Sequence, residues 1–97
     1  MSASLSTHVL DTGRGEPASG VLVEVFRSGD FVSRAETDET GRISELANDL
    51  EPGTYTLVFH PRSDFFPRVE LEVVLGDGHF HIPLLVSPYS CTTYRGS

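Results

Sequence analysis

An all-β sandwich of antiparallel strands is the fold class that this 97-residue sequence predicts, and three features of the pattern indicate it. No stretch of about ten residues repeats its apolar side chains with the helical period of about 3.6. Apolar and polar residues alternate instead with a period of two, as in strands that bury one face. Clusters of Gly, Pro, Asp and Ser interrupt the chain at short intervals, which is the spacing of turns in a sandwich.

Eight short strands are expected from this alternation. The clearest run is 68–75, in which Val69, Leu71 and Val73 alternate with charged residues. A weak helical pattern at 45–50 is the exception, and Pro52-Gly53 ends it at once. The expected strands cover residues 4–11, 20–27, 31–37, 42–46, 54–60, 68–75, 79–87 and 90–95, and turn residues separate them.

Composition and charge restrict the classes of partner. Fourteen acidic residues outweigh seven basic ones, so the net charge is −7. Binding to nucleic acid needs clustered Lys and Arg, whereas this chain has no lysine and only scattered arginines, so we expect no nucleic-acid partner. No apolar run approaches the about 18 residues of a membrane span, and no membrane association is expected.

The length indicates a small single domain, 1–97, and the cysteine content does not require an oxidising compartment. Cys91 is the single cysteine and cannot form an intrachain disulfide. The N-terminus lacks the pattern of a signal peptide, so a cytoplasmic location is expected. A domain of this size buries only roughly 60–65% of its unfolded surface, and association with further copies would therefore add stability.

Strand periodicity sorts the histidines onto an outward face. In the first strand His8 points with Ser6 and Leu10, on the face opposite Thr7 and Val9. In the strand 79–87 the core side carries Phe80, Ile82, Leu84 and Val86, so the opposite face carries His79, His81, Pro83 and Leu85. Such a row is unusual for open solvent and indicates the floor of a cleft or a subunit interface.

These residue types suit hydrolysis by an activated water. A histidine with a near-neutral pKa can act as a general base. Arg42 follows a tight turn and could stabilise an oxyanion, Tyr94 could donate a hydrogen bond to a planar heterocycle, and the carboxylate of Ser97 could orient an imidazole. The residues alone also allow ordinary surface roles for His8 and Arg42. His79 and His81 could chelate a metal, but no further ligand stands at suitable spacing.

Three separated segments resemble the 5-hydroxyisourate hydrolase family, which is related to transthyretin. The first is 5–12 with Arg14-Gly15, Pro17-Ala18 and Gly20-Val21, and the second is 37–43. The third and most specific combines 79–89 with Thr93-Tyr94-Arg95-Gly96-Ser97. The resemblance implies a transthyretin-like sandwich of two four-stranded sheets, a homotetramer built as a dimer of dimers, and clefts along the channel between the dimers.

The resemblance also implies an activity and a set of site residues. The reaction is hydrolysis of 5-hydroxyisourate to 2-oxo-4-hydroxy-4-carboxy-5-ureidoimidazoline in urate degradation, without a cofactor or a metal. The implied catalytic residues are His8, Arg42, His81 and Ser97. The implied substrate-binding residues are His8, Arg42, Tyr94, Arg95 and Gly96, and the supporting residues are His79, Pro83 and Leu10.

Two local departures from the family pattern stand out. Only residues 61–64 separate the fifth strand from Phe65-Phe66-Pro67, where family members usually have a longer segment with a short helix. Ser90-Cys91 stands where Gly-Tyr is usual. The alternatives to the hydrolase are a transthyretin-like protein that only binds a small ligand and an inactive family member.

Overall fold

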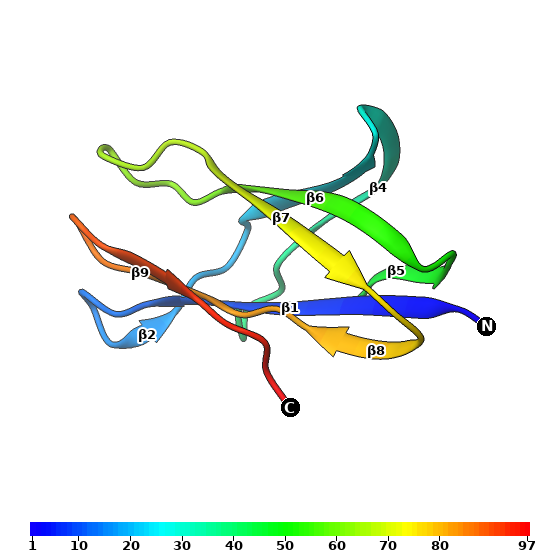
Figure 1. Ribbon diagram of the computed structural model, residues 1–97. Helices are drawn as coiled ribbons and strands as arrows, with labels where there is room; N and C mark the ends of the chain where they lie inside the picture. The colour runs from blue at the N-terminus through cyan, green and yellow to red at the C-terminus, as the bar shows by residue number, and fades with distance from the viewer.

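A computed structural model describes residues 1–97 and contains two β-sheets packed face to face (Figure 1). One sheet has the strand order β4-β3-β6-β7. The other has the order β10-β9-β1-β2, and β5 and β8 also pair with β1. No helix long and apolar enough to cross a membrane is present. The strands are β1 Ala3–Asp11, β2 Glu16–Pro17, β3 Leu22–Arg27, β4 Asp30–Glu36, β5 Arg42–Leu50, β6 Gly53–His60, β7 Val69–Leu75, β8 Gly78–His81, β9 Leu84–Val86 and β10 Cys91–Thr93.

The core lies between the two sheets, as the alternation predicts. In β6, Tyr55, Leu57 and Phe59 are buried and face the core, and in β3 Val23 and Val25 do the same. Burial of such side chains is the main favourable contribution to folding, roughly 1.5–3 kcal/mol for each large apolar residue. The expected sandwich is therefore confirmed, and its β4-β3-β6-β7 sheet has the expected four strands.

The sheet around β1 differs from the expectation in strand direction. β1 pairs in an antiparallel way with β2 and β5, but it runs parallel to β8 and β9. The chain reaches β8 directly from β7 of the opposite sheet, so no hairpin ties β8 to β1. The sandwich is as predicted, but its parallel pairs were not foreseen, because local alternation does not report the direction of a partner strand that is distant in sequence.

The expected strand 79–87 is divided into β8 and β9 at Ile82 and Pro83. Proline has no N–H for the sheet, so the strand is interrupted there. The register with β1 continues across the break, because Ser6 lies opposite His81 and Val9 opposite Leu84. This division, with the short strand β2, raises the expected four strands of this sheet to six.

The weak helical pattern at 45–50 was wrong, since these residues belong to β5. Leu46, Ala47 and Leu50 are buried, at a spacing that resembles one face of a helix. The pairing of β5 with β1 contains register shifts on both sides of Leu5, which are β-bulges or similar irregularities. An extra residue in one strand shifts the alternation of side chains, and this explains why the period of two fails here.

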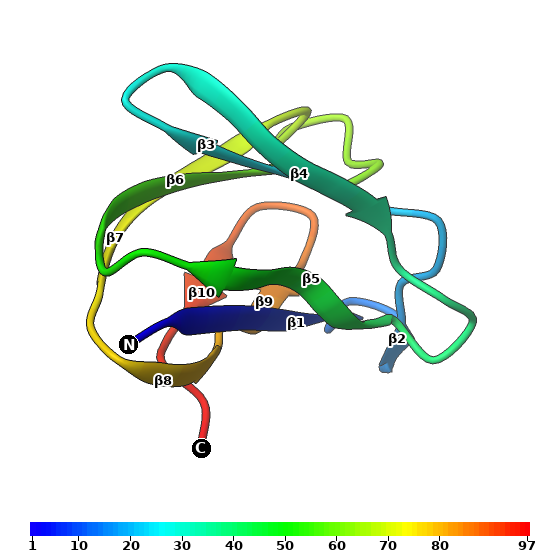
Figure 2. The same ribbon diagram turned by 90° about the vertical axis from the view of Figure 1, so that its right-hand side faces the viewer.

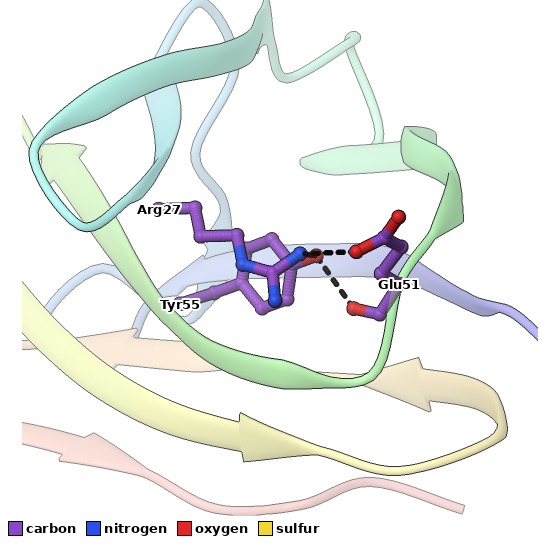
Figure 3. A network of polar contacts seen from close by, with 3 residues as sticks. All are labelled: Arg27, Glu51 and Tyr55. Atoms are coloured by element: carbon purple, nitrogen blue, oxygen red, sulfur yellow. Dashed lines mark hydrogen bonds and ion pairs between the residues drawn. The ribbon is translucent and has the colours of Figure 1, made fainter.

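The turn between β5 and β6 is tied to β3 by a small polar network (Figure 3). The buried Tyr55 hydroxyl donates to the Glu51 carbonyl at 2.6 Å and accepts from Arg27 at 3.3 Å. The Arg27 guanidinium also lies 5.3 Å from the centre of the Tyr55 ring and 3.3 Å from the Glu51 carboxylate. This network joins the end of the β3 strand to the neighbouring turn.

At the opposite end of the sheets, residues 61–68 connect β6 to β7 without a helix. Phe65 packs against Phe66 and Tyr89, with ring centres 4.8 and 5.4 Å apart. A cavity of about 740 Å³ opens beside this connection and contains none of the four histidines. The short connection predicted from the sequence therefore leaves one end of the sandwich open.

Candidate functional site

Two histidines and two serines form a chain of hydrogen bonds on the outer face of the sheet around β1. Because β1 and β8 run parallel, Ser4 lies opposite His79 and Ser6 lies opposite His81. The Ser6 hydroxyl is 2.8 Å from Nδ1 of His81 and 2.8 Å from Nε2 of His79. The Ser4 hydroxyl is 2.7 Å from Nδ1 of His79. The outward row of histidines predicted from alternation is thus held by hydroxyl groups of the neighbouring strand.

His8 lies on the same face, two residues beyond Ser6 along β1. The strand register places it opposite Arg42, the first residue of β5. The Nε2–H of His8 donates to the carbonyl of Thr40 at 2.9 Å. A carbonyl can only accept, so the neutral ring carries its proton on Nε2 and keeps a lone pair on Nδ1. His8 therefore presents Nδ1 as a proton acceptor.

The turn before Arg42 is organised by Asp38. Its carboxylate accepts hydrogen bonds from the Thr40 hydroxyl at 2.6 Å, the Thr40 N–H at 2.8 Å and the Arg42 N–H at 3.1 Å. The bond from the Thr40 hydroxyl lowers the pKa of Asp38 most, and the N–H groups of Arg42 and Thr40 lower it further. This charged carboxylate fixes the turn from which both the Thr40 carbonyl and Arg42 extend.

The glycine of this turn allows it to lie directly against β1. Gly41 has a φ of +78°, and it has no side chain to fill the space beside Val9. A Cβ at Gly41 would lie 2.5 Å from the Val9 carbonyl oxygen, closer than any real contact. The Gly41 carbonyl accepts from the Val9 N–H at 2.7 Å, so the turn is anchored next to His8.

The site favours an uncharged imidazole at His81. Partial burial lowers the pKa of His81 below its ordinary value of 6.5, and the positive charges of His8, Arg42 and His79 lower it further. A neutral imidazole can accept a proton, whereas an imidazolium cannot. With Nδ1 bonded to Ser6, Nε2 is the atom of His81 that is available to a ligand.

The segment 93–97 is tied to His81 through its backbone. Gly96 forms an isolated bridge with His81, and its N–H donates to the His81 carbonyl at 2.7 Å. Arg95 stacks over the ring of Phe80, 4.4 Å from its centre, on the core side of β8. Tyr94 is 56% exposed and, with Arg95, lines a groove of about 350 Å³ against β7. Ser97 is exposed.

The remaining expected residues lie at the edges of this cluster. Leu10 is half-buried beside His8 and pairs with Leu85 of β9. Pro83 is buried instead of lying outward, and the Thr93 hydroxyl covers it by donating to its carbonyl at 2.8 Å. No group of three His, Cys, Asp or Glu residues lies close enough to hold a metal ion. Cys91 packs against the core, where burial raises the pKa of its thiol.

The structure thus brings together His8, Arg42, His79 and His81 with the backbone of Gly96. It does not bring the side chains of Tyr94 and Arg95 into this cluster within one chain. Sequence reasoning missed Ser4, Ser6 and Thr40 as groups that hold the histidines. The alternation of β1 did place Ser6 on the face of His8, but its pairing with β8 could not be read from the sequence.

The fold and the site together define a transthyretin-like sandwich that carries a histidine and arginine cluster on its outer sheet face. The model of the HIUase/Transthyretin family matches residues 5–96 of this chain. The chain belongs to the HIUase/Transthyretin family, as the motifs predict.

Known relatives match the chain over nearly its whole length. The 5-hydroxyisourate hydrolase of Deinococcus radiodurans is 41% identical, with 96% of this chain and 95% of that protein covered. The probable 5-hydroxyisourate hydrolase of Schizosaccharomyces pombe is 39% identical, with 97% and 91% covered. The solved structure of Klebsiella pneumoniae 5-hydroxyisourate hydrolase superimposes with a TM-score of 0.89 at 36% identity, covering 98% of this chain and 99% of that one.

The alignment with the Deinococcus protein runs over 114 positions, whereas this chain has 97 residues. That relative therefore carries residues without a counterpart here.

Proposed function

We propose that this protein hydrolyses the ring amide of 5-hydroxyisourate to 2-oxo-4-hydroxy-4-carboxy-5-ureidoimidazoline, as a step of urate degradation. Membership of the family and the names of its relatives support this activity. The observation that carries the proposal is the cluster of His8, Arg42 and His81 on one sheet face, where the surroundings lower the pKa of His81.

The proposed mechanism uses the two free ring nitrogens as proton acceptors. Nδ1 of His8 and Nε2 of His81 position a water molecule, and one of them takes its proton as the oxygen attacks the carbonyl. Arg42 stabilises the oxyanion that forms and holds the ring. General-base catalysis of this kind contributes about 10²–10⁴ in rate. An activated cyclic amide needs no cofactor for this step.

We assign the segment 94–97 to closing the site over the substrate. Gly96 lies against His81, and Tyr94 and Arg95 are exposed just before it in the chain. Within one chain their side chains line a different groove, so this role requires the site to be completed by another copy. Ser97 would orient an imidazole in the same arrangement.

We further propose that the protein is a homotetramer, a dimer of dimers, located in the cytoplasm. The histidine cluster lies on an open sheet face beside half-buried Leu10 and Leu85. Covering this face with a second copy would turn it into a cleft and remove water from the reacting groups, which strengthens electrostatic interactions. Light scattering tests the assembly: a tetramer is expected, and a monomer at working concentration would contradict it.

The activity is tested with 5-hydroxyisourate made in situ from urate by urate oxidase. Its near-UV absorbance should decay faster in the presence of the protein. The rate should be about 10²–10⁴-fold lower in His81→Gln and Arg42→Ala. The remote variants His60→Gln and Arg34→Ala should keep the wild-type rate. Decay at the spontaneous rate from a folded protein would favour a transthyretin-like protein that only binds a small ligand, or an inactive member of the family.

A further inference from the structure

We propose that Ser6, His79 and Ser4 form a proton relay that connects His81 to solvent. This inference rests on the proposed hydrolysis, because it gives the proton of the attacking water a route out of the site. The relay residues do not touch the reacting atoms and act through His81. Figure 2 shows β8, which carries both histidines, beside β1, which carries both serines.

The chain of contacts is continuous from a half-buried group to exposed ones. Three hydrogen bonds of 2.8, 2.8 and 2.7 Å join His81 to Ser6, Ser6 to His79 and His79 to Ser4. Ser6 is only 7% exposed, so water competes little for its hydroxyl. His79 is exposed, and Ser4 is half-buried. The relay requires the second copy to cover His8 and His81 and to leave the His79 and Ser4 end open, where protons enter or leave.

The single proton of the Ser6 hydroxyl couples the two rings. Its oxygen is 2.8 Å from a nitrogen of each ring, so it can donate to one ring only and must accept from the other. When Ser6 donates to His79, His81 carries its proton on Nδ1 and presents a lone pair at Nε2. When Ser6 donates to His81, the neutral His81 ring carries its proton on Nε2. Reversing the direction of the two hydrogen bonds at Ser6 therefore converts Nε2 of His81 from a proton acceptor to a proton donor.

The relay step leaves every ring neutral. An O–H bond of water breaks, and an N–H bond forms at Nε2 of His81 while the Nδ1–H bond of His81 breaks. That proton moves to Ser6, whose own proton moves to Nε2 of His79. The Nδ1 proton of His79 moves to Ser4, which releases its proton to solvent. Later the C–N bond breaks, and its electron pair passes to the leaving nitrogen, which takes the Nε2 proton of His81. The relay then returns a proton from solvent to Nδ1 of His81.

The charges around His81 explain why a relay helps. The groups beside it that carry or can carry positive charge come from three elements: the His8 ring on β1, the Arg42 guanidinium on β5 and the His79 ring on β8. The carboxylate of Asp38 is bonded within its own turn. An imidazolium at His81 would be partly buried and would lie near the Arg42 guanidinium, which is unfavourable. The relay avoids this imidazolium, because Nδ1 of His81 loses a proton as Nε2 gains one.

The test compares variants that break the relay with variants that keep it. In Ser6→Ala and His79→Gln the kcat should fall by up to about 10²-fold with KM unchanged, and added imidazole buffer should restore the rate by accepting the proton instead. Ser6→Thr keeps a hydroxyl and should need no buffer. The wild type and the controls Ser44→Ala and His60→Gln should be independent of buffer concentration. Circular dichroism checks that each variant is folded.

A second readout does not depend on activity. ¹⁵N chemical shifts of His81 report which ring nitrogen carries the proton, and His79→Gln should change that distribution through Ser6. An active wild type whose relay variants match it, or whose loss is not restored by imidazole, would overturn the relay alone. A wild type with no hydrolytic activity would overturn the proposed function and, with it, the relay's place in catalysis.

Discussion

Gly96 lies so close to the ring of His81 that a side chain at this position would displace the ring. Its N–H donates to the His81 carbonyl at 2.7 Å, and a Cβ on Gly96 would lie 2.6 Å from Cδ2 of the imidazole. The same ring is held on its other side by the Ser6 hydroxyl at 2.8 Å. The orientation of His81 is therefore set by two segments that are far from each other in the sequence.

Gly96→Ala should displace the His81 ring and lower kcat. A shift of about 1 Å at a reacting group can cost about 10²-fold in rate. The matched control is Gly76→Ala, since Gly76 has open space around its Cβ position and no positive φ. Steady-state kinetics on both variants checks this. Equal rates for the two proteins would show that Gly96 does not determine the position of His81.

Arg42→Gln should raise the pKa of His81. Burial contributes most to lowering that pKa and His8 comes next, so the new value should rise but stay below 6.5. An NMR titration of the His81 ring measures the midpoint, with Arg34→Gln as the control of equal charge change. A midpoint that does not move would mean that Arg42 does not act on His81.

Stability should depend on the same titration. The native pKa of His81 is lowered, so the unfolded state binds more protons between the native value and about 6.5. The contribution of His81 to stability is therefore full above about pH 6.5 and is lost as the pH falls to the native pKa. In Arg42→Gln the pH range between the native pKa of His81 and about 6.5 should narrow, because the native pKa rises. Denaturant unfolding across this pH range measures it, and an unchanged pH dependence would contradict the assignment.

Gly41→Ala should destabilise the protein more than Gly15→Ala. Both glycines have a positive φ, +78° and +71°, but only Gly41 lies against backbone, 2.5 Å from the Val9 carbonyl oxygen for an added Cβ. The left-handed conformation alone costs an alanine about 1–2 kcal/mol, and the contact at Gly41 adds to it. Denaturant unfolding compares the two variants. Equal losses would mean that the turn moves freely away from β1.

Tyr55→Phe should lower the free energy of unfolding by about 0.5–1.5 kcal/mol, because the hydroxyl bond to the Glu51 carbonyl is lost. The ring, which is only 2% exposed, and its contact with Arg27 would remain. Tyr89→Phe is the control, since Tyr89 is 79% exposed. Thermal unfolding that is identical for both variants would show that the network in Figure 3 adds no stability.

Much of the fold could be predicted from the alternation of apolar and polar residues, because a strand that buries one face has apolar side chains at every second position. The core face of the expected strand 79–87, with Phe80, Ile82, Leu84 and Val86, was predicted from alternation, and so was the outward direction of His79 and His81. The prediction failed where a strand departs from this regular alternation. The irregular pairing of β5 produced a helix-like spacing at 45–50, and Pro83 divided one strand into two.

The sequence by itself determined the sandwich, the family motifs and the residue types of the site, since these depend on local pattern and on side-chain chemistry. Only the tertiary structure decided that β1 runs parallel to β8, and that parallel register is what sets Ser6 between His79 and His81. It also placed the Thr40 carbonyl against His8. Such contacts join residues more than 30 positions apart, so they depend on how the strands pair and leave no trace in the pattern of either strand alone.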